Sequence, residues 1–178
     1  MSTKKTKLTI FTIGHSTHTL SQFIELLKHY GITCLVDIRT IPRSRHTPQF
    51  NEKEFSNALK HVHIKYTHLA ELGGLRHAHK DSINTAWHNA SFRGFADYMQ
   101  TKEFSAGIAT LLALAQHDQV AIMCAEAVPW RCHRSLVGDA LLVRGINVED
   151  IFSLTSVKPH ILTPWAQVEG TNITYPQK

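Results

Sequence analysis

The stretch Ala121–Arg134, AIMCAEAVPWRCHR, decides how the chain is organised. The apolar run that opens it, Val120–Met123, is short and continuous, which is typical of a strand buried on both faces of a parallel sheet. Pro129 suits the first turn of a helix, where its missing N–H costs nothing, and we expect this helix to run to about Val143. The stretch therefore predicts a strand, a polar loop and a helix N-terminus. That geometry favours anions and thiolates in the loop.

Composition limits the class of protein. The chain has 178 residues, which is enough for one domain, and its formal net charge is +5 with its 13 histidines counted as neutral. A positive charge favours an anionic partner such as a small anionic molecule, a nucleotide or a nucleic acid. Three cysteines, an odd number, fit a reducing compartment better than a disulfide framework. Since no apolar run reaches the roughly 18 residues that a membrane span needs, we expect a cytoplasmic protein with no membrane partner.

Short apolar runs alternate with helical patterns on both sides of the central stretch. Thr19 with Gln22, and Asn51 with Glu54, are spaced as capping boxes, and each pair predicts the start of a helix. The other predicted elements are strands at 7–13, 32–38, 63–66, 120–123 and 148–152, and helices at 92–100 and 104–115. Periodicity disappears over 72–91, which indicates a long functional or mobile loop.

This alternation predicts a single α/β domain over 1–178, with a core at about 8–152 and an irregular C-terminal tail at 153–178. We expect a mostly parallel central sheet of about five strands with helices on both faces. The carboxyl ends of parallel strands gather at one edge of a sheet, where such folds bind ligands. The loops after the first, second and fourth strands are therefore expected to line one pocket.

Five ordered motifs make the sequence recognisable: TIGHS at 12–16, LVDIRTIPRSR at 35–45, LGGLR at 72–76, FRGFADYM at 92–99 and MCAEAVPWRCHR at 123–134. Together they resemble the bacterial and archaeal family catalogued as domain of unknown function 488, over roughly 12–151, with Phe95 where a tyrosine is usual. The resemblance implies a compact α/β domain and supplies no reaction. The shared polar residues that it implies correspond here to His15, Asp37, Arg39, Pro42, Arg45, Arg76, Arg93, Cys124, Glu126, Cys132, His133 and Arg134.

Cys124 and Cys132 are the candidate nucleophiles. A thiol near a helix N-terminus with arginines around it has a lowered pKa, whereas a free cysteine used only for packing is a small apolar filler. Six residues separate Cys124 from Arg131, and Pro129 removes one N–H donor, so the loop departs from the phosphate-binding loop of cysteine phosphatases. Phosphatase chemistry and sulfur transfer both stay open as readings of Cys124.

A metal site is the next alternative, because His15, Cys124, Cys132 and His133 are residue types that bind metals. Seven residues separate the two cysteines, which is looser than in a zinc knuckle. Adjacent Cys132 and His133 would also point about 100° apart on a helix. We predict no metal site and no cofactor.

The arginines point to an anion-binding site more strongly than the cysteines and histidines point to a nucleophile or a metal site. The anion-binding candidates are Arg39, Arg45, Arg131 and Arg134, with Arg43, Arg76 and Arg93 as further candidates. Guanidinium groups bind phosphate or carboxylate through paired hydrogen bonds, so several of them in one pocket favour an anionic ligand. In the alternative reading, Arg39 and Arg134 pair with Asp37, Glu126 or Asp139 and hold the loops together.

Asp37 and Glu126 are the candidates for general acid–base catalysis, with His15 or His133 as proton carriers. Ser16 is a further site candidate. An ion pair at Asp37 and a helix cap at Glu126 are the alternatives. The aromatic residues near the basic loops would stack a base if the ligand is a nucleotide. They are Tyr66, Trp87, Phe92 and Trp130.

These residues support three hypotheses about function. The first is a cysteine-dependent or acid/base-dependent hydrolase or transferase that acts on a nucleotide, nucleic acid or other phosphorylated substrate, with Cys124, Glu126, His15 and Asp37 as catalytic candidates. The second is a non-enzymatic nucleotide or nucleic-acid binding module, which needs the arginines but not Cys124. The third is a thiol or metal redox sensor, which requires cysteines that can be oxidised or metallated.

Overall fold

The computed structural model describes residues 6–178, so the basic residues Lys4 and Lys5 ahead of the first predicted strand lie outside it. The strands are β1 (Thr9–Gly14), β2 (Cys34–Asp37), β3 (Lys65–His68), β4 (Val120–Cys124), β5 (Asn147–Ser153), β6 (Ser156–Pro159), β7 (Gln167–Glu169) and β8 (Asn172–Thr174). The α-helices are α1 (Leu20–His29), α2 (Glu52–His61), α3 (Ala90–Tyr98), α4 (Lys102–Ala115) and α5 (Arg134–Leu142). Three short 3-10 helices are η1 (Pro48–Phe50), η2 (Ala70–Leu72) and η3 (Pro129–Arg131).

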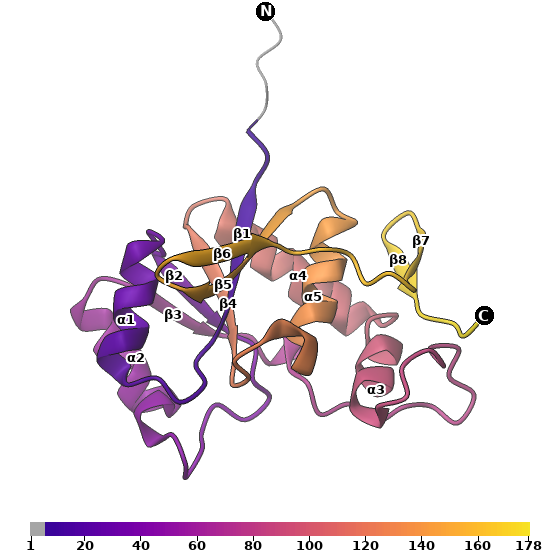
Figure 1. Cartoon of the computed structure of the whole chain (residues 1–178), viewed down its shortest axis with the longest axis horizontal. Coiled ribbons are helices and arrows are strands. Elements are labelled where there is room, and N and C mark those ends of the chain that lie inside the picture. The colour runs from indigo at the N-terminus through magenta and orange to yellow at the C-terminus, as the bar shows by residue number, and fades with distance from the viewer. Residues whose placement is uncertain (1–5) are drawn as a thin grey trace, which may run out of the picture.

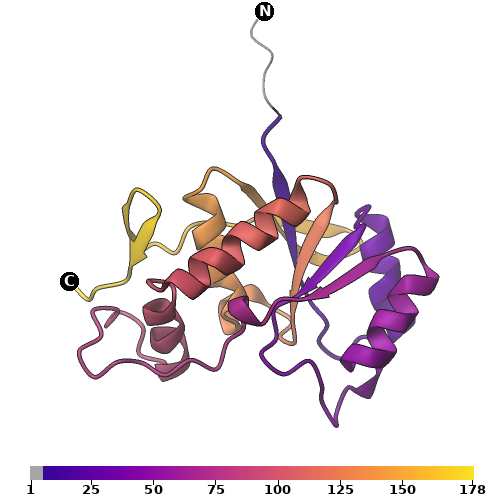
Figure 2. The same cartoon turned by 180° about the vertical axis from the view of Figure 1, so that it is seen from behind.

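The central sheet has six strands in the order β3-β2-β4-β1-β5-β6 (Figure 1). Its first five strands pair in parallel, and β6 pairs antiparallel with β5. Figures 1 and 2 show α1 and α2 on one face and α3, α4 and α5 on the other. Phe23 and Phe55 pack with Leu35 in one apolar cluster, whereas Leu111 and Leu136 belong to the cluster on the opposite face. The predicted α/β fold, with a mostly parallel sheet and helices on both faces, is confirmed.

The connections around β4 create room for a ligand. β4 lies between β1 and β2. The chain leaves β1 and β2 for α1 and α2 on one face, but it leaves β4 for α5 on the other (Figure 1). Neighbouring parallel strands whose connections diverge in this way leave a crevice outside their carboxyl ends. That crevice lies beside Cys124, the last residue of β4.

One of the two predicted capping boxes is confirmed. Thr19 Oγ1 accepts from the Gln22 N–H at 3.1 Å, and Gln22 Oε1 accepts from the Thr19 N–H at 3.0 Å. The second is wrong, because the side-chain oxygen of Asn51 accepts from the Ser44 N–H at 2.8 Å and closes the loop ahead of α2. Spacing alone does not show which backbone N–H a polar side chain will reach.

The prediction of an irregular C-terminal tail is wrong, because this segment contains strands. β6 extends the central sheet and β7 pairs with β8 as a hairpin. Tyr175 is fully buried, donates its hydroxyl to Asp139 Oδ2 at 2.8 Å, and donates its N–H to Asn84 Oδ1 at 2.8 Å. Most residues of β6 and β7 are exposed, so these strands lack the apolar alternation that reveals a strand in sequence. The core therefore extends beyond residue 152 to Tyr175.

Residues 73–89 form neither helix nor strand, as expected, but side chains of α3 hold this loop. Asp97 accepts hydrogen bonds from His79 N at 2.8 Å, Ser82 Oγ at 2.6 Å and Asn84 Nδ2 at 2.7 Å. Arg93 Nε donates to the Trp87 carbonyl at 3.0 Å. The loop is thus anchored along one side. Across residues 6–178, no helix combines the length and apolar character needed to cross a membrane.

Candidate functional site

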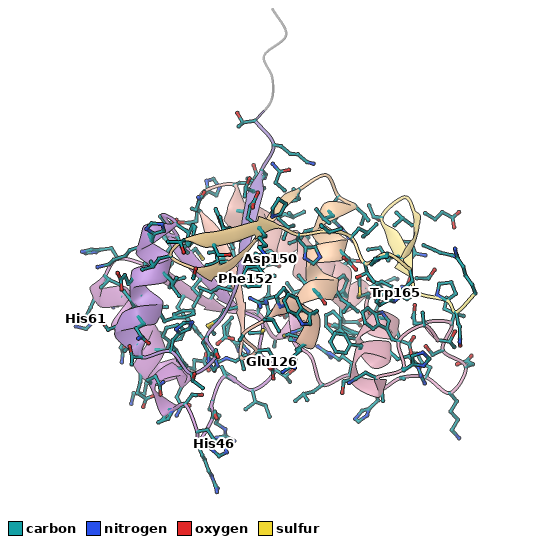
Figure 3. The ribbon with its side chains drawn as sticks, viewed as in Figure 1. His46, His61, Glu126, Asp150, Phe152 and Trp165 are labelled. Carbon is teal, nitrogen blue, oxygen red and sulfur yellow. The ribbon has the colours of Figure 1, made fainter. Side chains whose placement is uncertain are left out.

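A cleft of about 380 Å³ opens where β2 and β4 end. It brings together six residues that the sequence predicted as site candidates: Arg39, Cys124, Glu126, Arg131, Cys132 and His133. Part of its remaining wall comes from Gly74 and Leu75 in the long loop and from Phe92 at the start of α3. Glu126 is labelled in Figure 3, on the loop that follows β4. The loops after the second and fourth strands therefore meet.

The end of β1 supports the loop after Cys124 from behind. The N–H of His15 donates to the Cys124 carbonyl and the N–H of Ser16 donates to the Ala125 carbonyl, both at 3.0 Å. A Cβ on Gly14 would overlap the carbonyl oxygen of Glu126, so this close approach requires glycine. Ser16 adopts φ 46°, in the left-handed region, and its N–H is used by the loop. The first predicted loop thus positions the site without lining the cleft.

The predicted helix start at Pro129 is wrong. Pro129 begins η3, Cys132 is extended with φ −138° and ψ 148°, and α5 begins only at Arg134. The N–H groups of Arg134 and Ser135 donate to the Cys132 sulfur at 3.5 Å and to the Cys132 carbonyl at 3.1 Å. The extended Cys132 interrupts the helical path that Pro129 starts. Cys132 therefore lies at the amino end of α5, where the partial positive charge favours an anion.

The thiol of Cys124 lies near that of Cys132 and near the guanidinium of Arg134, and its sulfur lies 3.7 Å from the Glu126 carbonyl oxygen. Burial opposes ionisation of Cys124, but the neighbouring thiol of Cys132 and the charge of Arg134 outweigh it, so the pKa of Cys124 is lowered. The neighbouring thiol of Cys124 and burial raise the pKa of Cys132. Two anions in contact repel, so the pair ionises once, at Cys124, and Cys132 keeps its proton.

Arg134 is buried without an acidic partner. Its side chain is 1% exposed, and its Nη2 lies 3.5 Å from the Glu126 carbonyl oxygen. Within residues 6–178, no acceptor contacts its Nε and Nη1. An uncompensated buried cation costs several kcal/mol, so an anion beside it is strongly stabilised. The alternative reading, a pair with the Asp139 carboxylate, is wrong, because Asp139 instead accepts from His160, Thr163 and Tyr175.

His133 is neutral and holds the β2 loop against α5. Burial and the charges of Arg134 and Arg76 lower its pKa to about 4. Its Nε2 lies 2.9 Å from the Ile38 carbonyl oxygen, which assigns the ring hydrogen to Nε2. The bare Nδ1 lies 3.4 Å from Cys132 Sγ and can accept the proton of that thiol.

Asp37 forms an ion pair that fixes Arg39. Arg39 Nε donates to Asp37 Oδ1 at 2.9 Å and Arg39 Nη2 donates to Oδ2 at 2.7 Å. The Tyr66 hydroxyl also donates to Oδ2, at 2.6 Å, and Asp37 is fully buried. Of the two readings of Asp37, these contacts favour the ion pair, since acid–base work needs access to the cleft.

His15 lies behind Arg39 and is not a lining residue of the cleft. Its ring stacks on Phe50 at 4.5 Å between centroids, and its Nε2 lies 3.4 Å from Arg39 Nη1. Burial lowers its pKa, although the hydrogen bond with the Ser16 carbonyl opposes that shift. Arg39 Nη2 also donates to the Phe50 carbonyl at 2.7 Å. Arg39 is thus held on three sides. Its Nη1 directs one N–H to His15 Nε2 and has a second N–H left for the cleft.

The other candidate arginines do not converge on this cleft. Arg43 and Arg45 are exposed on the loop between β2 and α2, and Arg43 lines a separate groove. Arg76 donates to the Gly73 and Ala70 carbonyls at 3.2 and 3.1 Å and lies 3.6 Å over the ring centroid of Tyr98. Arg93 likewise donates to a backbone carbonyl, that of Trp87. A guanidinium that caps backbone carbonyls has the same sequence signature as one that binds phosphate.

A buried polar cluster beside the cleft was missed by sequence reasoning. His160 Nδ1 lies 3.0 Å from Asp150 Oδ2, and His160 Nε2 lies 3.0 Å from Asp139 Oδ1. Burial lowers the pKa of His160, but the two carboxylates outweigh burial and raise it to about 9. Thr12 Oγ1 donates to Asp150 Oδ1 at 2.5 Å. His160 lies in the segment predicted to be irregular, so no pattern placed it there.

From residue 6 to 178, no group of three or more His, Cys, Asp and Glu side chains is arranged to hold a metal ion.

The comparisons with known proteins identify a family. The family model described as "Domain of unknown function DUF488" matches residues 19–141. No curated protein and no solved structure matches the chain. The family match covers more than half of the chain and includes every lining residue of the cleft named above. The chain therefore belongs to the domain of unknown function 488 family.

Proposed function

We propose that the protein is a cysteine-dependent hydrolase or transferase that acts on an anionic, phosphorylated substrate in the cleft at the end of β4. One observation carries the proposal: Cys124, a cleft thiol with a lowered pKa, lies beside the buried guanidinium of Arg134. The thiolate is the reactive form of cysteine, and an arginine next to it stabilises it. A cysteine that only fills the core needs no such neighbour.

Substrate binding uses groups that the fold leaves available. Arg39 Nη1 and the exposed Arg131 side chain present positive charge to the cleft. Backbone N–H groups and guanidinium groups are the donors that phosphate oxygens prefer. The cleft therefore suits a phosphate group more than a neutral ligand.

The reaction follows from these positions. The Cys124 thiolate attacks the phosphorus of a phosphate ester, an S–P bond forms, the P–O bond to the leaving group breaks, and the leaving alkoxide takes a proton from solvent; Glu126 returns a proton to solvent after the second step. Water or an acceptor hydroxyl then attacks phosphorus and gives its proton to Glu126, and the S–P bond breaks to restore the thiolate. Arg39 and Arg131 stabilise the charge on the phosphoryl oxygens in both steps.

Cys132 and His133 support the nucleophile in this proposal. The Cys132 thiol lies beside Cys124 and keeps its proton, so the pair carries a single negative charge. Neutral His133 presents Nδ1 to Cys132 at 3.4 Å. Because no positive charge on His133 is needed, the arrangement works at neutral pH.

A second candidate function is a thiol redox sensor, which the neighbouring thiols of Cys124 and Cys132 favour. In that case two-electron oxidation by hydrogen peroxide would join the two sulfurs, the O–O bond would break, and its two oxygens would leave as water with the Cys132 proton and one proton from solvent. A pure nucleotide-binding module is the third candidate, and it needs neither thiol.

Turnover of an aryl phosphate ester and of a panel of nucleotides by the purified protein tests the proposal. Cys124→Ser is expected to reduce turnover by about 10³-fold or more while leaving phosphate binding almost unchanged. Cys34→Ala is the matched control, because Cys34 is a free cysteine buried in β2 outside the cleft. Equal turnover by Cys124→Ser and the native protein would refute the nucleophile. Phosphate binding without turnover would favour the binding module.

A further inference from the structure

A second pocket shares η3 with the cleft. Its volume is about 360 Å³, within the range of about 300–1,000 Å³ typical of small-ligand pockets. All three tryptophans of the chain, Trp87, Trp130 and Trp165, line it together with Phe152. Trp130 is 65% exposed and Trp165 is 44% exposed. We name this the tryptophan pocket; Figure 3 labels two of its lining residues, Phe152 and Trp165, together with Glu126 of the cleft.

The aromatic rings form walls that suit a flat ligand. The rings of Trp130 and Phe152 are 6.1 Å apart and tilted by 38°, whereas those of Trp87 and Trp165 are 5.2 Å apart and nearly perpendicular at 69°. Exposed faces of large aromatic rings bind planar heteroaromatic groups by stacking, whereas alkyl chains gain no such geometry. The walls therefore favour a flat heteroaromatic ring over an acyl chain.

The floor of the tryptophan pocket is held by buried hydrogen bonds. His160 lines it and bridges Asp139 on α5 to Asp150 on β5 at 3.0 Å on each side. Ser135 adds a hydroxyl, and Lys158 lies at 5.8 Å from the ring centroid of Phe152. Both ring nitrogens of His160 are engaged by carboxylates and the Ser135 hydroxyl donates to the Cys132 carbonyl at 3.0 Å, whereas Lys158 is exposed. The exposed ammonium group of Lys158 can donate a hydrogen bond to a ring nitrogen or carbonyl oxygen of a base.

Two structural links join the tryptophan pocket to the phosphate-binding cleft. In η3, Trp130 lines the pocket and the next residue, Arg131, lines the cleft. Across the long loop, Trp87 lines the pocket and stacks at 4.9 Å on Phe92, which lines the cleft. A ligand with an aromatic ring at one end and a phosphate at the other matches this layout.

We propose that the tryptophan pocket binds the base of a nucleotide whose phosphate lies in the cleft beside Cys124, Arg39 and Arg131. This inference rests on the proposed phosphate site and narrows its substrate class to nucleotides. A free nucleotide and the end of a nucleic acid strand present the same base and phosphate, so the ligand chemistry is shared and the probes must separate the two sources.

Intrinsic fluorescence gives a direct test, because all three tryptophans line the pocket and report on its occupant. The Cys124→Ser protein, which does not consume the ligand, is titrated with AMP, GMP, CMP and UMP, with the four nucleosides, with ribose 5-phosphate, and with 5′-phosphorylated trinucleotides. At least one nucleotide is expected to change the fluorescence and to bind about 5- to 150-fold more tightly than ribose 5-phosphate, the range expected for stacking one base. A trinucleotide that binds more tightly than every mononucleotide would identify a strand end as the source.

Three variants separate the outcomes. Trp130→Ala is expected to reduce nucleotide affinity to that of ribose 5-phosphate without changing ribose 5-phosphate affinity, and Trp130→Phe is expected to restore most of it. Ile83→Ala is the matched control, since Ile83 is 58% exposed and lines neither pocket. Equal binding of ribose 5-phosphate and all nucleotides would overturn the base pocket while leaving the phosphate site standing. If neither ribose 5-phosphate nor any nucleotide binds, the phosphate site and the base pocket are both overturned.

Discussion

The buried cluster of Asp139, His160 and Asp150 predicts a specific dependence of stability on pH. The pKa of His160 is raised to about 9 in the folded protein, against an ordinary value of about 6.5 when unfolded. A raised pKa means that the folded state binds the proton more tightly, so its contribution is fully present below about pH 6.5 and is lost as pH rises through 9. The linkage relation gives about 3 kcal/mol between pH 6 and pH 10, because one pKa unit corresponds to about 1.4 kcal/mol.

Urea unfolding from pH 6 to pH 10 measures this contribution. Other groups also titrate over that interval, so the informative quantity is the difference in pH dependence between the native protein and His160→Gln. The native protein is expected to lose about 3 kcal/mol more than the variant, with most of the loss between pH 7 and pH 9.5. Parallel pH profiles for the two proteins would refute the charged His160 and its two carboxylate contacts.

Two further predictions concern the cleft. Gly14→Ala is expected to lower stability by about 1–3 kcal/mol and to weaken phosphate binding, because its Cβ would overlap the Glu126 carbonyl and displace the loop after Cys124. Thermal unfolding and a phosphate titration check both effects, and a stable variant with unchanged affinity would contradict the close packing. The effect of His133 on stability has the opposite pH dependence to that of His160. Its pKa is lowered to about 4 in the folded protein, so its contribution to the free energy of unfolding is fully present above about pH 6.5, and about 3 kcal/mol of it is lost as pH falls toward 4. Acid unfolding of His133→Asn is expected to lack that loss, and an unchanged acid transition would contradict it.

The sequence predicted the parts of the fold that rest on apolar periodicity. The central strand, the α1 capping box and the alternation of strands with helices follow from residues such as Thr19 and the Val120–Met123 run, whose signals are local. β6 and β7 were missed because edge and hairpin strands with exposed faces carry little periodicity. Contacts such as Tyr175 with Asp139 span distant segments, and no local pattern encodes them.

The candidate site was predictable to the extent that topology gathers strand ends. Residues after β2 and β4 meet because those strands are neighbours with diverging connections. Sequence could not separate arginines by role: Arg39 and Arg131 face the cleft, whereas Arg76 donates to the backbone carbonyls of η2 and its flank. The tryptophan pocket was also hidden, because Trp165 lies far from Trp87 and Trp130 in the chain.

The most direct test of the central claim is the rate of alkylation of each cysteine as a function of pH, resolved by mass spectrometry, in the native protein and in Arg134→Met. Circular dichroism checks that the variant is folded. The account predicts that Cys124 is alkylated with an apparent pKa below the ordinary thiol value of about 8.5, that Cys132 is not, and that loss of Arg134 raises the apparent pKa of Cys124. An unreactive Cys124, or a Cys124 whose ionisation is the same with and without Arg134, would contradict it.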